Sequence, residues 1–357
     1  MKPLGLGFIG LHHQHPRWYR PLWSELPEYK PLAMAEADEP FLKKENELFK
    51  LDVYTDYRRL LERPDVDVVA IWLPHSQMPQ AVADAAEAGK HVIVEKPCAA
   101  DVAGIRRIAG TARRHPKIKI SAPYCWRTHP VTAEIRKAAA TGLFGQITAV
   151  EGRLNAGGAH RYIRDNAPWM LRRAEGGGPM WNLGVHWVDY FSWITGQRVA
   201  SVMGVATGPV GEPKRDIEDT AQALLKFQDG AVGILDISYS LPDSYPGKRD
   251  IFVAIRGTLG DIAWTPNWEG TTEELLLVSE HSSVGKDKCR RIPVVCKSIP
   301  GYCGQMAWEW LRDFSCAIRE NRSPVVTVAD MVSAVEVVDA FYRSLKSGRS
   351  EAVESSA

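Results

Sequence analysis

The chain has 357 residues, which exceeds the roughly 250–300 residues at which a single hydrophobic core stops growing, so we expect two domains. The formal net charge of +1 lacks the basic excess of nucleic-acid-binding proteins, and no apolar run approaches the roughly 18 residues of a membrane helix. A strand pattern starts at Leu4 and leaves no room for a cleavable signal, and the six cysteines are scattered. We therefore expect a cytoplasmic protein with reduced thiols and neither a nucleic-acid nor a membrane partner.

Strand and helix patterns alternate over the first 121 residues. The predicted strands are Leu4–Ile9, Pro31–Glu36, Val53–Tyr54, Val66–Leu73, His91–Val94 and Lys117–Ser121. The predicted helices are Pro16–Leu26, Pro40–Phe49, Tyr57–Glu62, Gln77–Gly89 and Asp101–Arg114. Repeated β-α-β units of this length predict a doubly wound parallel sheet of the α/β class. We assign residues 1–122 to a Rossmann-type dinucleotide-binding domain.

The pattern changes after Pro123. One helix is predicted at Pro130–Thr141. Alternating segments follow at Gln146–Leu154, Val199–Val205, Asp219–Phe227, Ala231–Ser240, Ile251–Arg256 and Glu274–Val278. Two helices, Met306–Asn321 and Val328–Ser347, come last. Residues 123–357 therefore form a second, α+β domain around a large, mainly antiparallel sheet with one polar face.

The turn after the first strand is the expected phosphate site. A dinucleotide fingerprint needs glycine at positions 10, 12 and 15, and this chain has only Gly10, with His12 and His15 at the other two. The histidines could shift the cofactor, contact its phosphates through imidazole, or mark a site for another ligand. A structural role or a metal ion held by the nearby histidines are further alternatives. We assign all three residues to the cofactor site and predict no metal.

An acidic residue, Glu36, ends the second predicted strand. A carboxylate at this position accepts hydrogen bonds from the adenosine ribose hydroxyls and repels a 2′-phosphate, so NAD is favoured over NADP. A solvated acidic loop is the alternative interpretation. Pro74 and His75 directly follow the Val66–Leu73 strand, and we expect them to contact the cofactor as well.

The most specific motif of the first half is Glu95-Lys96-Pro97, which follows the His91–Val94 strand. Open α/β sheets bind ligands at the carboxyl ends of their strands, so Glu95 and Lys96 are expected in that crevice. Lys96 can donate a hydrogen bond to a substrate hydroxyl or carbonyl, and partial burial would lower its pKa towards the acid–base range. The alternative is a solvent-facing lysine paired with Glu95.

A second motif starts at the glycine triplet 176–178 and continues into a helical pattern. Asn182 and His186 are four residues apart on this helix, and Asp189 lies one turn further, so we expect their side chains to face the same space. His186 could be a general base for a hydroxyl proton. The alternative is a buried, hydrogen-bonded histidine with no chemical role.

Taken together, these motifs resemble the Gfo/Idh/MocA oxidoreductases over nearly the whole chain. The resemblance implies a Rossmann domain followed by a substrate-binding domain whose open sheet supports homodimers or homotetramers. It implies that Lys96 orients or protonates at the reacting carbon, that His186 accepts the proton and that Arg127 lies near the cofactor or substrate. Asn182 stands where the family frequently has aspartate, and we include it in the catalytic set because an amide can hold geometry.

Substrate residues are expected in the loop before the glycine triplet and near other aromatic residues. The candidates are Trp126, His160, Arg161, Tyr162, Trp169, Trp181 and Asp189. Polar groups beside aromatic walls suit a sugar or polyol ring, whereas a surface loop with buried aromatic anchors is the alternative.

Three functions follow from these observations. The first is hydride transfer between NAD and a carbon of a sugar, polyol or related cyclic substrate. The second is NAD-assisted hydrolysis or elimination of a glycosidic group, with the cofactor recycled in the site. The third is a ligand-binding protein without catalysis, in which the altered turn at His12 and His15 no longer binds the cofactor.

Overall fold

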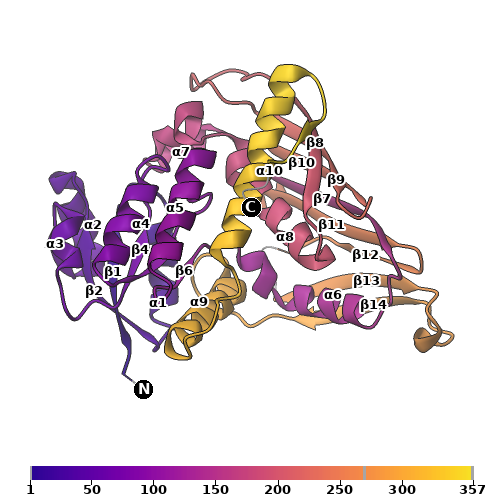
Figure 1. Ribbon diagram of the computed structural model, residues 1–357, viewed down its shortest axis with the longest axis horizontal. Coiled ribbons are helices and arrows are strands. Elements are labelled where there is room, and N and C mark those ends of the chain that lie inside the picture. Colours follow the sequence, from indigo (N-terminus) through magenta and orange to yellow (C-terminus); the bar gives the residue numbers. More distant parts are fainter. Residues whose placement is uncertain (1, 268–270, 355–357) are drawn as a thin grey trace.

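The computed structural model describes residues 2–267 and 271–354 and contains two sheets placed side by side (Figure 1). The first sheet has six parallel strands in the order β3-β2-β1-β4-β5-β6. Its strands are β1 (Leu4–Ile9), β2 (Tyr29–Ala35), β3 (Asp52–Tyr54), β4 (Val68–Ile71), β5 (His91–Val94) and β6 (Ile120–Ser121). This strand order is that of a Rossmann fold, whose ligand crevice opens beside β1 and β4.

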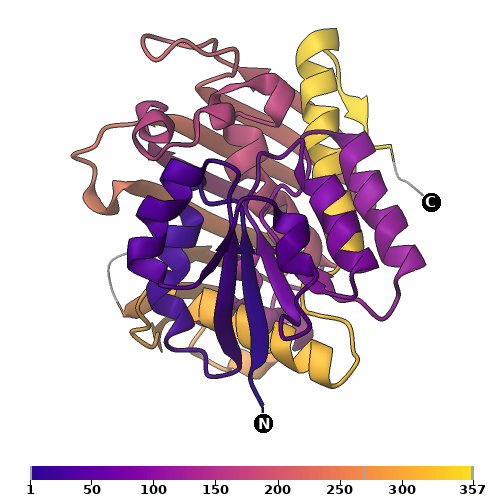
Figure 2. The same ribbon diagram turned by 90° about the vertical axis from the view of Figure 1, so that its left-hand side faces the viewer.

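Five helices accompany the first sheet, and Figure 2 shows helices on either side of its strands. They are α1 (His15–Trp23), α2 (Glu39–Phe49), α3 (Tyr57–Leu61), α4 (Met78–Glu87) and α5 (Val102–Arg114). Every residue of β4 is buried, as expected for a parallel strand covered on both faces. The predicted doubly wound parallel sheet is confirmed.

The second sheet has nine strands in the order β14-β13-β12-β11-β7-β10-β9-β8-β15. They are β7 (Ile147–Gly157), β8 (Val199–Ala206), β9 (Thr220–Phe227), β10 (Val232–Leu241), β11 (Arg249–Gly257), β12 (Gly260–Trp264), β13 (Thr272–Ser279), β14 (Cys289–Val295) and β15 (Glu351–Ala352). Among the described strands of this second sheet, only the pair β7 and β10 is parallel, so the predicted mainly antiparallel sheet is confirmed.

Three strands of this sheet were absent from the sequence prediction, namely β12, β14 and the two-residue β15. β12 starts at Gly260, in the interval between Arg256 and Glu274 where we predicted no strand. β14 lies at the sheet edge, and none of its residues is fully buried. A strand without a buried face carries no alternating apolar signal, which explains why the pattern missed it.

The remaining helices follow the first sheet in the chain. They are α6 (Pro130–Ala140), α7 (His160–Arg164), α8 (Val185–Thr195), α9 (Gly304–Arg319) and α10 (Val328–Ser347), with a π-helical turn at Met180–Gly184 directly before α8. The helix α10 packs against β8 and α8 on one side and against α5 on the other. It therefore joins the second sheet to the Rossmann unit (Figure 1).

The helix α9 packs on the first domain, although its sequence lies far beyond residue 122. The Tyr29 hydroxyl donates a hydrogen bond to the carbonyl oxygen of Leu311 at 2.7 Å. The indole nitrogens of Trp308 and Trp310 donate to the Glu25 carbonyl at 2.8 Å and to the Ser121 hydroxyl at 3.2 Å. The C-terminal part of the chain thus returns to cover the N-terminal unit (Figure 2).

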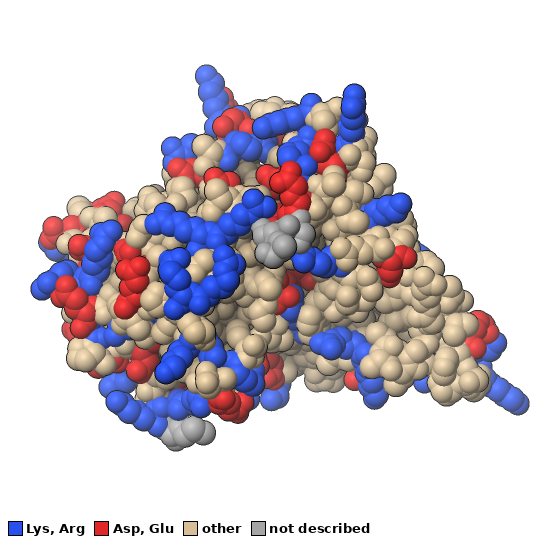
Figure 3. All heavy atoms as spheres, viewed as in Figure 1, with Lys and Arg blue, Asp and Glu red and all other residues tan. Residues whose placement is uncertain are grey.

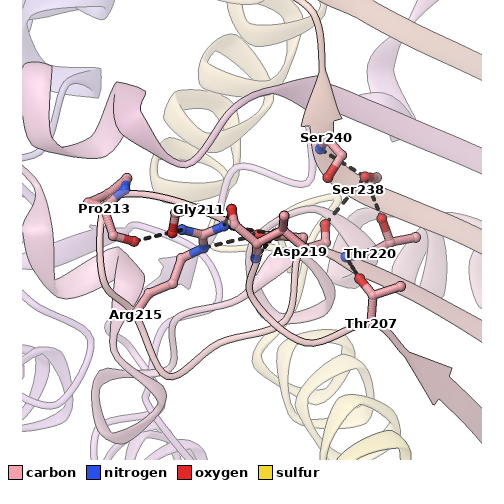
Figure 4. Close-up of polar contacts among 9 residues, drawn as sticks. Thr207, Gly211, Pro213, Arg215, Asp219, Thr220, Ser238 and Ser240 are labelled. Atoms are coloured by element: carbon pink, nitrogen blue, oxygen red, sulfur yellow. Dashed lines mark hydrogen bonds and ion pairs between the residues drawn. The ribbon is translucent and has the colours of Figure 1, made fainter.

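A buried arginine fixes the loop between β8 and β9 (Figure 4). The Arg215 guanidinium donates to the Asp219 carboxylate from Nε at 2.9 Å and from Nη2 at 2.7 and 2.8 Å. It also donates to the carbonyl oxygens of Gly211 and Pro213. The Arg215 side chain is only 3% exposed, and its counter-ion lies beside it. The loop therefore holds the start of β9 in place.

The surface carries charges of both signs. On the face seen in Figure 3, Lys and Arg side chains gather over α5, and acidic side chains lie beside them. The exposed arginines of α5 are Arg106, Arg107, Arg113 and Arg114. Among the described helices, none combines the length and the apolar composition needed to cross a bilayer.

Candidate functional site

Lys96 lies just beyond the end of β5 and is 4% exposed. Its Nζ atom donates a hydrogen bond to the main-chain oxygen of Asn182 at 2.7 Å and another to the Oδ1 atom of the same residue. The nearest carboxylate oxygen of Glu95 is 4.0 Å away. Burial lowers the pKa of Lys96 to about 8, and Glu95 opposes this effect. Lys96 is therefore not the solvent-facing lysine of our alternative interpretation.

Asn182 lies in the π-helical turn and joins Lys96 to the wall of the second domain. Its main-chain N–H donates to the Gly178 carbonyl at 2.9 Å, and its side-chain nitrogen donates to the hydroxyl of Tyr162. Because the amide accepts from Lys96 on one side and donates to Tyr162 on the other, its orientation is fixed. Asn182 therefore positions the ammonium group.

His186 lies in α8, one turn beyond Asn182, and faces the same space. Its Nδ1 atom is buried and has no hydrogen-bond partner. Burial, and next the charge of Lys96, lowers the pKa of His186 well below its usual 6.5. Burial therefore favours the neutral imidazole, in which one ring nitrogen carries no proton.

Asp189 does not share this space, in contrast to our expectation. Its carboxylate accepts hydrogen bonds from Arg127 Nε at 2.9 Å and Nη2 at 2.6 Å, and both side chains are buried. Arg127 also contacts Asp330 of α10 at 3.0 Å and donates to the Val325 carbonyl. Burial raises the pKa of Asp189 to about 6, and Arg127 opposes this effect. The structure thus places the predicted cofactor residue Arg127 and the predicted substrate residue Asp189 in an ion pair that joins α8 to α10.

The glycine triplet ends in a position that only glycine can occupy. Gly178 has a φ of +121°, and a Cβ atom there would lie 2.8 Å from the Tyr342 hydroxyl and 2.9 Å from Glu218 Oε1. The Tyr239 hydroxyl donates to the Gly178 carbonyl at 3.1 Å, and Arg173 donates to Glu218 at 2.6 Å. This tight packing sets where the turn that carries Asn182 begins.

The three predicted catalytic residues line one cavity between the two sheets, which we call the central cavity. Of the predicted substrate residues, Trp126, Arg161 and Tyr162 line it. Its other lining residues are Gln14, His15, Trp18, Tyr19, Glu95, Pro123, Cys125, Leu154, Leu183, Arg249, Tyr302 and Cys303. Sequence reasoning missed Arg249 and Tyr302, because Arg249 starts β11 and Tyr302 precedes α9 in segments that carry no recognisable motif.

The other substrate candidates lie outside the central cavity. His160 is exposed, and its Nε2 atom is 3.4 Å from Asp243. Trp181 is buried and stacks on Tyr342 with ring centroids 6.0 Å apart. Trp169 lines the cleft beside Gly10 instead.

That second space, which we call the cofactor cleft, has a volume of about 460 Å³ and opens beside β1 and β4. Its lining residues are Ile9, Gly10, His12, Ala35, Glu36, Ala37, Thr55, Asp56, Tyr57, Arg58, Trp72, Leu73, Pro74, Gln77 and Trp169. Gly10 has a φ of +80°, and a Cβ atom there would lie 2.9 Å from the Leu73 main-chain nitrogen. The first fingerprint glycine is thus required by close backbone packing.

His12 stands on the wall of the cofactor cleft in place of the second glycine. Its ring stacks on Phe41 with centroids 4.2 Å apart, and its Nδ1 atom contacts the Asn166 side chain. Its Nε2 atom is 3.8 Å from the Glu36 carboxylate, which also accepts a hydrogen bond from the Leu11 N–H at 2.8 Å. One backbone donor of the phosphate turn is thereby already engaged.

His15 points to the other side and does not share a ligand space with His12. Its Nδ1–H donates to Glu95 Oε2 at 2.9 Å, and its main-chain N–H donates to His13 Nδ1 at 3.1 Å. Burial lowers the pKa of both imidazoles well below 6.5. The ligand atoms of His13, His15 and Glu95 lie within 4.8 Å of one another, and these hydrogen bonds account for their arrangement.

Of the two residues that follow β4, Pro74 lines the cofactor cleft. His75 is fully buried, and its Nδ1–H donates to the Gly176 carbonyl at 3.3 Å, while its Nε2 atom has no partner. Burial, and next the charge of Lys96, lowers the pKa of His75 to about 4. His75 thus connects the parallel sheet to the glycine triplet.

Comparison with known protein families decides the classification. Residues 4–122 match the oxidoreductase family with an NAD-binding Rossmann fold, and residues 132–263 match the GFO/IDH/MocA C-terminal domain. The chain belongs to the Gfo/Idh/MocA family of oxidoreductases. Residues 4–122 are therefore an NAD-binding domain, and the chain is a dehydrogenase or reductase.

Several Gfo/Idh/MocA relatives are similar over most of their length. An uncharacterized oxidoreductase, YrbE of Bacillus subtilis, is 26% identical and covers 98% of this chain and 95% of its own. Levoglucosan dehydrogenase of Pseudarthrobacter phenanthrenivorans is 25% identical over 76% of this chain and 74% of its own. A solved structure of levoglucosan dehydrogenase in complex with NADH and levoglucosan has a TM-score of 0.84 at 21% identity, covering 99% of this chain and 100% of the other.

The site of this Gfo/Idh/MocA chain fits a dinucleotide, with one local departure. Gly10 allows close approach, Glu36 lies where ribose hydroxyls are expected, and the cofactor cleft remains open. The departure lies at the start of α1, where backbone N–H groups normally face the cofactor phosphates. Here Pro16 has no N–H, and the His15 N–H already donates to His13. Fewer backbone donors than usual face the phosphates, and His12 supplies an imidazole on the same wall.

Proposed function

We propose that the protein is an NAD-dependent dehydrogenase that transfers a hydride between the cofactor and a CH–OH carbon of a sugar, polyol or related cyclic substrate. The observation that carries this proposal is the meeting of Lys96, Asn182 and His186 in the central cavity. A buried ammonium group with a lowered pKa and a neutral imidazole are the groups that alcohol oxidation needs.

The hydrogen bonds of Lys96 and His186 indicate which role each residue has in the proposed reaction. Lys96 has three N–H donors, and two of them hold Asn182, which leaves the third for the substrate oxygen. The unpartnered Nδ1 atom of His186 takes the hydroxyl proton. Bound nicotinamide supplies the hydride acceptor. Trp126 and Tyr162 form walls that orient the ring and exclude water.

The cofactor that we propose is NAD in preference to NADP. Glu36 presents a carboxylate in the cofactor cleft, and a 2′-phosphate beside it would be repelled. Arg58 also lines the cleft, but its guanidinium lies 3.4 Å from Asp84 and 3.6 Å from Asp56. Its charge is thus compensated within the protein.

We also propose a homodimer or homotetramer that forms through the outer face of the second sheet. Val205, Leu224, Val232 and Ile234 lie on the neighbouring strands β8, β9 and β10, and each side chain is exposed by 49–57%. A run of exposed apolar side chains across adjacent strands is typical of a subunit interface. Sedimentation of Leu224→Lys beside a Lys226→Ala control tests this, and an unchanged sedimentation coefficient would contradict it.

Three measurements test the proposed reaction. Mass spectrometry of small molecules released from the denatured protein shows whether a nicotinamide dinucleotide co-purifies. Calorimetry with NAD⁺ and NADP⁺ should give tighter binding of NAD⁺, and no binding of either at millimolar concentration would overturn the proposal. NADH formation on a panel of sugars and polyols should be lost in Lys96→Ala and retained in the control Lys43→Ala, whose side chain is 73% exposed.

A retained dinucleotide that never turns over would instead favour the NAD-assisted elimination. In that case, NADH would not accumulate, while a glycosidic bond of the substrate would be broken. Product analysis by mass spectrometry distinguishes the two reactions.

A further inference from the structure

The central cavity carries more positive charge than the proposed reaction uses. Its cationic lining residues are Lys96, Arg161 and Arg249, whereas Glu95 is its only carboxylate among the described residues. Glu95 Oε2 already accepts a hydrogen bond from His15. A cavity with this charge selects ligands that bring negative charge.

Arg161 is the cation whose environment is unusual. Its guanidinium carbon lies 4.7 Å from the ring centroid of Tyr162 and 5.2 Å from that of Tyr239. Its Nη2 atom donates to the Tyr162 hydroxyl at 2.6 Å, while its Nε atom is buried without a hydrogen-bond partner. Within the described ranges, no carboxylate oxygen lies within 4.0 Å of this guanidinium.

Two arginines with buried side chains have counter-ions. Arg127 contacts Asp189 and Asp330, and Arg215 contacts Asp219, with both arginine side chains 3% exposed. Arginine stays charged in proteins, and a buried charge without a partner is costly. The fold thus compensates Arg127 and Arg215 internally and leaves Arg161 without a counter-ion beside the reacting groups.

The cofactor phosphates do not account for Arg161. They are expected at the turn after Gly10, and the residues of the cofactor cleft and of the central cavity do not overlap. Arg161 belongs to α7, which follows the Rossmann unit in the chain. The anion that binds Arg161 is therefore expected to be part of the substrate.

We propose that the substrate is a sugar acid or a cyclic polyol acid, whose carboxylate binds Arg161 while its CH–OH group lies against Lys96 and His186. Besides the Nη2 bond to Tyr162, the guanidinium has further N–H donors, the unpartnered Nε–H among them, that can donate to the oxygens of a carboxylate. This inference rests on the proposed dehydrogenase function and narrows its substrate class.

The test compares matched pairs of substrates. The rate constant kcat/KM for NADH formation is measured for D-glucuronate against D-glucose, D-galacturonate against D-galactose, and the corresponding 6-phosphates. We expect the uronate of at least one pair to exceed its neutral sugar by at least about 10-fold, since charge-assisted hydrogen bonds contribute about 1.5–3 kcal/mol. Equal or faster turnover of the neutral sugars, or a preference for the phosphates alone, would overturn the inference.

Substitution of Arg161 shows whether this residue causes the preference. Arg161→Gln should lower the ratio of kcat/KM for acid over neutral sugar by about 10–100-fold. Arg161→Lys keeps the charge but loses the paired donors, so an intermediate ratio is expected. Arg164→Gln on the same helix is the control, because Arg164 is 61% exposed and pairs with Asp165. An unchanged ratio in folded Arg161→Gln would contradict the assignment.

A binding measurement separates this inference from the dehydrogenase proposal. Calorimetry of D-glucuronate with the NADH complex should show binding that weakens at least about 10-fold in Arg161→Gln. If NADH binds but no sugar is turned over, the proposed dehydrogenase function is contradicted. If neutral sugars are turned over without any preference for acids, only the proposed acidic substrate class is contradicted. Uronate binding that is identical in both proteins would overturn the role of Arg161.

Discussion

The Lys96 ammonium donates a hydrogen bond of 2.7 Å to the main-chain oxygen of Asn182, and this contact joins the crevice of the parallel sheet to the second half of the chain. Because the acceptor is a backbone atom in a π-helical turn, the position of the ammonium group depends on the conformation of that turn. The geometry of the proposed reaction is therefore shared between two parts of the fold.

The rate of alcohol oxidation should fall above pH 8. The pKa of Lys96 is lowered to about 8, so its ammonium form, which donates to the substrate oxygen, is lost as the pH rises through that value. A profile of kcat/KM from pH 6 to 10 measures this. In Lys96→Arg the charge persists at high pH, so any residual activity should lack the fall.

Asn182→Asp should move this fall to higher pH. A carboxylate in contact with Lys96 favours the ammonium form and raises the pKa of that residue by about 1–2. The same pH profile detects the change, and Asn182→Ser serves as the uncharged control. A profile that does not move would show that Lys96 does not govern the alkaline limb.

Gly178→Ala should damage both stability and activity. The added Cβ would meet the Tyr342 hydroxyl and Glu218 Oε1 at 2.8–2.9 Å, and alanine rarely adopts the φ of +121°, so these side chains or the turn that carries Asn182 must shift. We expect a loss of about 2–4 kcal/mol in the free energy of unfolding and a lower kcat. Gly196→Ala is the control for backbone strain alone, because Gly196 has a φ of +68° and no atom lies within 4 Å of the added Cβ. It should lower the free energy of unfolding by about 1 kcal/mol.

Asp189→Asn should lower the free energy of unfolding by about 3–5 kcal/mol, because it leaves the buried Arg127 charge without its bidentate partner. Urea unfolding measures the loss. Since neither residue lines the central cavity, the KM of the folded variant should stay within about threefold of the original value. A large rise in KM with an unchanged free energy of unfolding would instead support our original assignment of Asp189 to the substrate site.

Acid should destabilise the protein in part through His75. Its pKa is about 4 in the folded protein against 6.5 in the unfolded chain, so the unfolded chain binds the proton first as the pH falls below 6.5. The contribution of His75 at pH 5 is roughly 2 kcal/mol. His75→Gln should therefore show a smaller loss of unfolding free energy between pH 7 and pH 5 in urea titrations, and an equal loss would exclude this residue as the source.

The sequence predicted those features that have a regular local pattern. The strand His91–Val94 and the helix Val328–Ser347 coincide with β5 and α10, and Lys96, Asn182 and His186 do share one space. Asp189 was assigned to the wrong face, because its side chain turns to the buried Arg127, a partner 62 residues away that helical spacing could not reveal.

Long-range packing could not be predicted from one sequence. Arg249 and Tyr302 reach the central cavity from segments far from Lys96 in the chain, and no spacing links them to it. The same holds for the counter-ions, since Arg127 is buried with Asp189 whereas Arg161 has none. The structural role of Arg127 and the ligand-facing position of Arg161 can be told apart only once the fold has brought distant segments together.

The return of α9 to the first domain has a consequence for biosynthesis. The residues that α9 covers, including Tyr29, leave the ribosome long before Leu311 is made. At about 5–20 residues per second, the N-terminal unit waits roughly 10–40 s with this surface exposed. A nascent chain stalled before α9 should therefore bind chaperones and resist proteolysis poorly, although its six parallel strands are already complete.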